Sequence, residues 1–112
     1  MMDRPMIDLD VLTEGGKVHN LSGHDRGVAA REAFGLDQLD QQPSAIEIRV
    51  PDHIYAISPS FIQGLLATSV QKAGSSREGF FRRFSLNSSD LIKRQFDRGL
   101  SSILTNRDFS TL

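Results

Sequence analysis

The chain of 112 residues has no cysteine and no tryptophan, and it contains one tyrosine and seven phenylalanines. The absence of cysteine excludes disulfides, thiolate zinc sites and thiol nucleophiles. No run of about 18 apolar residues is present, so the sequence predicts no transmembrane helix. No basic start is followed by an apolar stretch, so it predicts no secretory signal either. We therefore expect a cytoplasmic protein that carries no cofactor.

Length and composition predict a single domain, because 112 residues with 38% hydrophobic side chains are enough for one core. The net charge of −1 conceals an uneven distribution. Residues 1–70 carry five basic and ten acidic side chains, whereas residues 71–112 carry eight and four. This division gives either separate acidic and basic faces or charges that interleave in space, and the sequence leaves both arrangements open.

The N-terminal segment predicts a β-hairpin. Residues 6–12 alternate imperfectly between apolar and polar side chains, as in a strand. The adjacent Gly15 and Gly16 favour a turn, because glycine adopts positive φ without steric cost. Residues 18–21 are then expected to return as the second strand.

A helix is predicted over residues 23–34. The Ser22 hydroxyl is suited to accept a hydrogen bond from the first turn, and Gly35 is suited to end the helix in a left-handed conformation. We interpret Arg31 and Glu32 as part of a solvated face. The expected buried face consists of Val28, Ala29, Ala33 and Phe34.

The strongest local prediction concerns the junction at Ser58. Residues 46–50 alternate cleanly, which predicts a strand with Ile46, Ile48 and Val50 facing the core. After Ile57 the apolar spacing becomes helical, and Pro59 falls at the first helical position, where its missing amide costs nothing. Ser58 is the expected N-cap, and Gly74 is expected to close the helix. The apolar stripe comprises Phe61, Ile62, Leu65, Leu66, Val70 and Ala73.

The C-terminal part predicts one more strand and one more helix. Residues 80–86 are rich in aromatics and are interpreted as a strand, and Asn87 or Ser88 is expected to cap a helix that runs to about residue 104. Its stripe is Leu91, Ile92, Phe96, Leu100, Ile103 and Leu104.

The element order is therefore β-β-α-β-α-β-α, which predicts an α/β fold with helices packed on a small mixed sheet of about four strands. The core is expected over about residues 6–104, with flexible ends at 1–5 and 105–112.

This order, together with the segment Ile57-Ser58-Pro59-Ser60-Phe61-Ile62, resembles the STAS domain, named for sulfate transporters and anti-sigma-factor antagonists. In that superfamily an apolar strand enters an Asp-Ser-Ser-Gly-Leu type turn and then a helix. An ungapped match places Pro59 on the first family serine, the usual phosphate acceptor, and Ser60 on the second. The form seen here is more similar to divergent STAS-like families of uncharacterised bacterial proteins with an "IS-x-SF" junction.

The resemblance implies a protein interaction module rather than an enzyme. Its partner would be a histidine-kinase-type ATPase or an anti-sigma-like regulator, bound through Ser58, Pro59, Ser60, Phe61 and Gln63. Ser60 is the candidate phosphorylation site, and a shift of one residue in the alignment would move the candidate to Ser58. A phosphate at a helix N-terminus is electrostatically favourable. The simpler alternative is that the junction is a helix cap and nothing more.

A nucleic-acid-binding domain is the alternative function. The segment from Glu78 to Phe84 has aromatic residues at positions similar to those of an RNA-recognition strand, although Glu78 replaces a basic residue and Phe81 a small one. The basic side chains that would serve such a surface are Arg77, Arg82, Arg83, Lys93, Arg94 and Arg98.

Other sites have less support in the sequence. His19, His24 and Asp25 allow a metal site to be imagined, but exposed loop histidines are the simpler interpretation. No Gly-x-Ser-x-Gly motif is present, and Gly15-Gly16-Lys17 lacks the rest of a phosphate-binding loop. Because no set of acid, base and nucleophile can be assembled, we expect no enzymatic activity and no metal.

Overall fold

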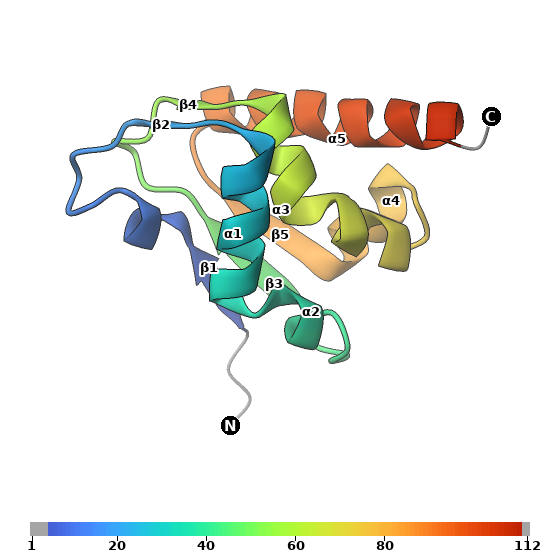
Figure 1. The fold of residues 1–112 in the computed structure, drawn as a ribbon. Coiled ribbons are helices and arrows are strands. Elements are labelled where there is room, and N and C mark those ends of the chain that lie inside the picture. The colour runs from blue at the N-terminus through green and yellow to red at the C-terminus, as the bar shows by residue number, and fades with distance from the viewer. Residues whose placement is uncertain (1–4, 111–112) are drawn as a thin grey trace.

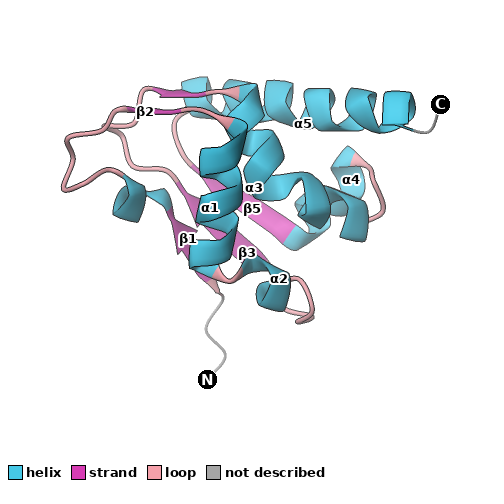
Figure 2. Cartoon of the chain, in the orientation of Figure 1, coloured by secondary structure: helices cyan, strands magenta, loops and turns pink. Residues whose placement is uncertain are grey.

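The computed structural model describes residues 5–110, with the backbone alone described for 106–110 (Figure 1). Strands alternate with helices along the chain, which confirms the α/β class (Figure 2). The elements are β1 Met6–Asp8, the 3-10 helix η1 Leu9–Leu12, β2 Asn20–Leu21, α1 His24–Phe34, α2 Leu36–Leu39, β3 Ile46–Arg49, β4 Ala56–Ile57, α3 Pro59–Lys72, α4 Arg77–Arg83, β5 Phe84–Asn87 and α5 Asp90–Ser110.

The main sheet has three parallel strands in the order β1-β3-β5. In the register of the central strand, Ile48 lies between Ile7 and Leu86. The expected mixed sheet of about four strands is therefore wrong, because every pairing in the described chain is parallel and the remaining two strands form a separate ladder. Parallel pairing follows from the helical connections, because each connection returns the chain to the end of the sheet at which the previous strand began.

The predicted N-terminal hairpin is also wrong. After β1 the chain turns into η1, where the Asp8 side chain accepts a hydrogen bond from the Asp10 amide and Leu9 is fully buried. Gly15 and Gly16 do adopt positive φ, as predicted. The segment beyond them does not return to β1, because β2 pairs in parallel with β4 and the pair Leu21 and Ile57 is buried there.

One face of the main sheet packs against the helices, and the other is exposed. Ile7, Ile46, Ile48 and Phe84 are buried toward α1, α3 and α5, together with Val50 just beyond β3. The opposite face carries Met6 and Glu47 in one row and Asp8, Arg49 and Asn87 in the next. The predicted inward positions of the strand at 46–50 are confirmed.

Helix α1 crosses α3 at a glycine contact. A Cβ atom added to Gly27 would lie 2.2 Å from the Phe61 carbonyl oxygen, and one added to Gly64 would lie 2.2 Å from the His24 carbonyl oxygen. This contact sets which face of α1 is buried, namely Gly27, Ala30 and Arg31. The predicted face is therefore only partly right: Phe34 is half-buried against the core and Val28 is half-buried, whereas Ala29 and Ala33 are exposed.

The predicted start of α1 is wrong, whereas its predicted end is confirmed. The N-cap is Gly23, with φ of 96° and no side-chain hydrogen bond, so the prediction that Ser22 caps this helix is wrong. Gly35 adopts the left-handed conformation at the C-terminal end, with φ of 67°, as predicted. Gly35 is also the residue from which the short α2 begins.

Helix α3 begins at Ser58-Pro59 as predicted. Ser58 caps it, Pro59 occupies the first position, and Phe61, Ile62, Leu65, Leu66 and Val70 are buried. Ala73, the last residue of the predicted stripe, is half-buried, and it forms the C-cap one residue before Gly74.

The predicted strand at 80–86 is half wrong. Arg77–Arg83 forms α4, because Ser76 accepts a hydrogen bond from the Gly79 amide and caps a helix that the aromatic composition concealed. Only Phe84–Asn87 is a strand.

Helix α5 is confirmed with a different start. The side chain that accepts a hydrogen bond from its first turn is Ser89, at 3.3 Å from the Ile92 amide, rather than Asn87 or Ser88. Ile92, Phe96, Leu100 and Ile103 are buried, Leu104 is partly buried, and Leu91 is exposed. The helix extends to Ser110, beyond the predicted end of the core, and residues 1–4 and 111–112 lie outside the described residues. None of the described helices combines the length and apolarity needed to cross a bilayer.

Candidate functional site

The corner between β4 and α3 is fixed by its own backbone and side chains. Ser58 is extended, with φ of −77° and ψ of 154°, and its Oγ accepts a hydrogen bond of 3.1 Å from the Phe61 amide. The Ser58 amide donates to the Leu21 carbonyl oxygen at 2.9 Å. The start of α3 is thus tied to β2, a segment almost 40 residues earlier in the chain.

The predicted partner-binding residues of this corner differ in accessibility. Pro59 and Ser60 are exposed, whereas Ser58 and Gln63 are half-buried. Phe61 is only 2% exposed, so its ring anchors α3 in the core. The Ser60 Oγ lies 3.1 Å from the Ser58 Oγ. Of the two hydroxyls, Ser60 is the one open to a partner, because the Ser58 oxygen is occupied by the cap.

A hollow of about 250 Å³ lies beside this corner. Residues of β2, β4, the start of α3 and α5 line it, and these elements lie together in Figure 1. The Ile57 amide donates a 2.6 Å hydrogen bond to the Gln95 Oε1, which joins β4 to α5. Arg98, one turn further along α5, lines the same hollow as Ser58 and Pro59. The corner therefore includes a cation that sequence reasoning had assigned to a different surface.

The six basic residues predicted for nucleic-acid binding do not act as one free surface. Arg77 is paired with Asp97 and also contacts Ser101. Arg83 donates to the Leu39 carbonyl oxygen, so its guanidinium holds α4 against the end of α2. The four others are exposed on α4 or α5, namely Arg82, Lys93, Arg94 and Arg98.

Arg31 is buried, although the sequence predicted that it belongs to a solvated face. Its side chain is 8% exposed and contacts the Asp40 side chain, which is 3% exposed, at 2.5 Å. It also donates to the Ser69 Oγ at 2.8 Å and to the Leu65 carbonyl oxygen at 3.0 Å. The Ser69 hydroxyl in turn donates to Asp40 at 2.8 Å. This network links α1, the end of α2 and α3, and no local sequence pattern indicated it.

The histidines have structural partners. His19 Nδ1 lies 2.7 Å from the His53 carbonyl oxygen, and the His19 ring stacks on Tyr55 with centroids 5.0 Å apart. His53 Nε2 lies 3.1 Å from the Asp10 carboxylate. His24 and Asp25 are adjacent and exposed at the start of α1. Within residues 5–105, no group of three or more His, Asp or Glu side chains is arranged to hold a metal ion.

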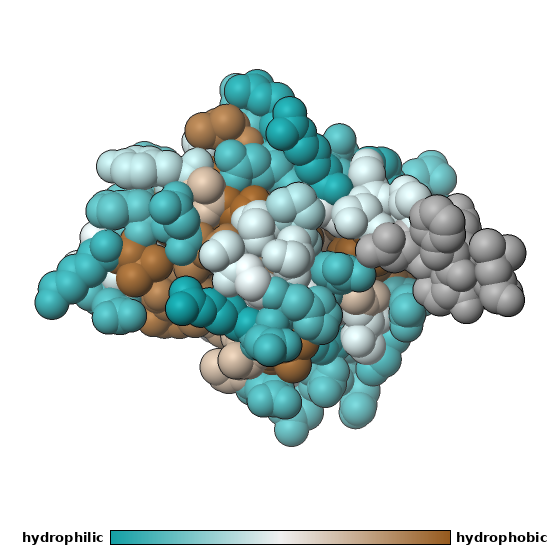
Figure 3. Space-filling model, turned by 45° about the horizontal axis from the view of Figure 1, so that its top comes forward, coloured by the Kyte–Doolittle hydropathy of each residue, from teal (hydrophilic) through white to brown (hydrophobic). Residues whose placement is uncertain are grey.

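The molecular surface offers no single dominant apolar face in the view of Figure 3, where brown patches are separated by hydrophilic side chains.

Comparisons of the chain with protein-family models, with curated proteins and with solved structures find no match in any of the three.

Proposed function

We propose that the protein is a small interaction module that binds a protein partner through the corner at Ser58–Gln63, with Arg98 as part of the same surface. The observation that carries this proposal is the hollow that Ser58 and Pro59 share with Gln95 and Arg98. It adjoins an exposed hydroxyl, a rigid helix start and a cation, which together suit an acidic or hydroxyl-bearing segment of another protein.

The rigidity of the corner supports a docking role. The Ser58 cap, the bond from Ser58 to Leu21 and the bond from Ile57 to Gln95 hold three elements in place before any partner arrives. A preorganised surface loses little conformational entropy on binding, so a small contact area can still give useful affinity.

The proposal extends to regulation at Ser60. Its hydroxyl is exposed in the first turn of α3, where a phosphate would interact favourably with the helix dipole. The phosphate would add about −1.5 to −2 charges next to Ser58, which lines the hollow together with Arg98, and so would compete with an acidic partner for that cation. Phosphorylation is therefore expected to release such a partner without unfolding the helix.

The class of partner follows from the resemblance to STAS domains. In that reading, the arrangement of elements is STAS-like and the partner is a histidine-kinase-type ATPase or an anti-sigma-like regulator. The exposed serine after the short β4 strand supports this interpretation. Pro59, at the usual acceptor position of the family, has no hydroxyl, so we take Ser60 as the candidate switch.

The test is quantitative capture of partners from lysate by immobilised wild-type protein and two variants. Ser60→Glu and Arg98→Gln are expected to weaken capture of the same protein about tenfold or more, since each alters the charge of the corner. The matched controls are Thr68→Glu and Arg94→Gln, which make the same charge changes at exposed positions of α3 and α5 outside the hollow. All four variants are expected to keep the wild-type melting temperature.

Two results would overturn the proposal. One is a captured protein that responds equally to the corner variants and their controls. The other is tight binding of a random single-stranded oligonucleotide, with an affinity that falls steeply as salt is raised and depends on Arg82, Lys93 and Arg94. That second result would establish the nucleic-acid-binding alternative.

A further inference from the structure

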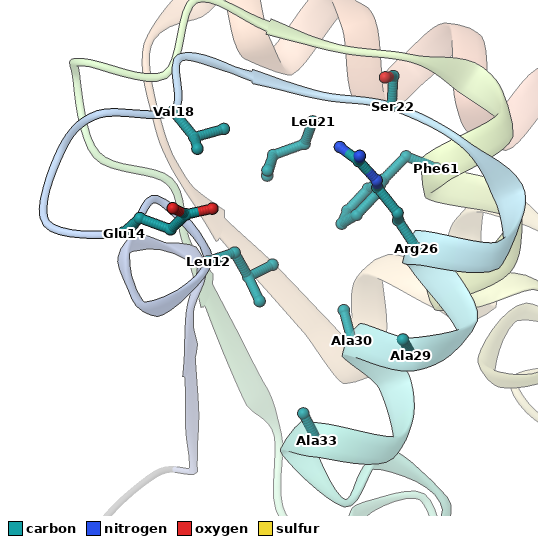
Figure 4. Close-up of a pocket in the computed structure, with 10 residues that line it drawn as sticks. All are labelled: Leu12, Glu14, Val18, Leu21, Ser22, Arg26, Ala29, Ala30, Ala33 and Phe61. Carbon is teal, nitrogen blue, oxygen red and sulfur yellow. The ribbon is translucent and has the colours of Figure 1, made fainter.

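A second pocket is enclosed by the loop after η1, by β2 and by α1 (Figure 4). Its charged residues differ from those of the corner at Ser58–Gln63. Its volume is about 360 Å³, which is within the range of small-molecule sites, roughly 300–1,000 Å³. The walls are mainly apolar. They are formed by Leu12, Val18 and Leu21 on one side, by Ala30 and Ala33 of α1 on the other, and by the Phe61 ring from α3.

Two opposite charges face this apolar space. Figure 4 shows the Glu14 carboxylate entering from the loop and the Arg26 guanidinium entering from α1, on opposite walls of the pocket. Both side chains belong to exposed residues. In the described part of the chain, neither forms an ion pair or a hydrogen bond with another side chain. Among the described residues, the pocket thus presents one anion and one cation without a side-chain partner, both facing an apolar interior.

The backbone at Glu14 adopts a conformation that residues other than glycine rarely take. Glu14 adopts a φ of 52°, in the left-handed region, as do Gly15 and Gly16 after it. Glycine is favoured in that region, and residues of other types held there cluster at binding and active sites. The fully buried Thr13 holds the turn, because its Oγ1 accepts from the Gly16 amide at 3.2 Å and donates to the Asp10 carbonyl oxygen at 2.7 Å. Within residues 5–105, the Glu14 side chain makes no hydrogen bond or ion pair of its own.

We propose that this pocket binds a free apolar α-amino acid. The ligand carboxylate would pair with Arg26, its ammonium group with Glu14, and its side chain would lie among Leu12, Val18 and Phe61. A zwitterion satisfies both charges at once. A simple carboxylic acid would bring an anion toward Glu14, and a simple amine would bring a cation toward Arg26, so each analogue leaves one protein charge facing a like charge.

The experiment compares four ligands by isothermal titration calorimetry and amide chemical-shift mapping. L-phenylalanine and L-leucine are the zwitterions, 3-phenylpropanoate lacks the amino group, and 2-phenylethylamine lacks the carboxylate. Binding of the amino acids is expected to exceed that of either analogue about tenfold or more, because each lost ion pair leaves a charge unpaired. The largest shift changes are expected in residues 12–22 and in the first two turns of α1.

Variants assign the two charges separately. Glu14→Gln is expected to remove the preference for L-phenylalanine over 3-phenylpropanoate, and Arg26→Gln the preference over 2-phenylethylamine. Glu78→Gln and Arg94→Gln make the same changes at exposed positions outside the pocket and are expected to leave affinity unchanged. Ala33→Leu fills the pocket from an exposed position of α1 and is expected to abolish binding in a folded protein.

Several outcomes would overturn the inference: no shift changes at millimolar amino acid, equal binding of 3-phenylpropanoate, or tighter binding of an apolar peptide than of the free amino acid. The inference does not rest on the proposed function. Glu14→Gln is expected to leave partner capture unchanged, and Ser60→Glu to leave amino-acid binding unchanged, so failure of one is distinguishable from failure of the other.

Discussion

At the scale of single residues, Arg31 is a buried cation with four polar partners. Its guanidinium donates to Asp37, Asp40, Ser69 and the Leu65 carbonyl oxygen while its side chain stays 8% exposed. A buried charge of this kind is stable only with its partners, because desolvation of an unpaired charge is strongly unfavourable. The partners lie six to 38 residues away in sequence, which is why the helical pattern around Arg31 and Glu32 indicated a solvated face.

Arg31→Met is expected to lower the free energy of unfolding by about 3–5 kcal/mol, because it leaves the Asp40 carboxylate buried and unpaired. Urea denaturation followed by circular dichroism measures this loss. The double variant Arg31→Met/Asp40→Leu is expected to recover most of it, since a buried pair replaced by apolar side chains is often neutral in stability. The neighbouring exposed Glu32→Gln serves as the control, expected within about 0.5 kcal/mol of wild type. A double variant no more stable than the single one would contradict the assignment.

At the scale of elements, a helix or strand was predicted correctly when the residues that specify it are close together in sequence. Helix α3 was predicted with its cap and its buried stripe because Ser58, Pro59 and the apolar spacing are neighbours in sequence. The same local pattern made the corner a candidate site, and that role remains a prediction. The position of Arg98 beside the corner depends on the packing of α5 against β4 and has no local signature.

The failures among the elements were of two kinds. The hairpin failed because β2 finds its partner in β4, more than 30 residues later, and a short apolar run does not reveal which strand it will pair with. The strand at 80–86 failed because the aromatic run Phe80-Phe81 favours a strand, while the Ser76 cap and burial of Phe80 favour α4. The pocket at Glu14 and Arg26 also lay beyond sequence reasoning, since its walls come from three separate segments.

The crossing of α1 and α3 depends on Gly27 and Gly64. Glycine to alanine in a helix interior normally adds up to about 1 kcal/mol of stability through propensity. Gly27→Ala is nevertheless expected to destabilise by about 1–3 kcal/mol, because the added Cβ would meet the backbone of α3 at the Phe61 carbonyl oxygen and the Leu65 amide. Ala29→Gly at an exposed position of α1 gives the propensity term alone.

Thermal and urea unfolding measure the stability of the Gly27→Ala and Ala29→Gly variants. Gly64→Ala is expected to have a similar effect, and the double variant is expected to cost less than the two single losses together, because both Cβ atoms separate the same pair of helices. A Gly27→Ala protein as stable as wild type, or more stable, would show that the two backbones do not approach as closely as described.

At the scale of the whole molecule, the main sheet is covered on one face and exposed on the other. Parallel sheets are usually covered on both faces. Here the exposed face is polar apart from Met6, and its side chains pair across strands: Arg49 contacts Asp8 at 2.9 Å, and the Asn87 amide group donates to Glu47 at 3.0 Å. These pairs allow the exposed face to remain in water, so the helices need to cover only the opposite side.

This one-sided packing predicts an order of local stability. β3 is bonded on both sides: the Glu47 amide donates to the Pro5 carbonyl oxygen and the Val50 amide, just beyond it, to that of Asn87. Its buried side chains lie under the helices. The β3 amides are therefore expected to exchange hydrogen only through global unfolding, with a denaturant dependence equal to that of the whole protein, whereas the short α2 and α4 open locally and exchange faster.

Amide exchange by NMR at increasing urea tests this order, and Arg31→Met should lower the β3 protection by the same free energy as it lowers global stability. If the β3 amides exchange as fast as those of α4, with a rate that does not depend on urea, the core is not organised around the central strand.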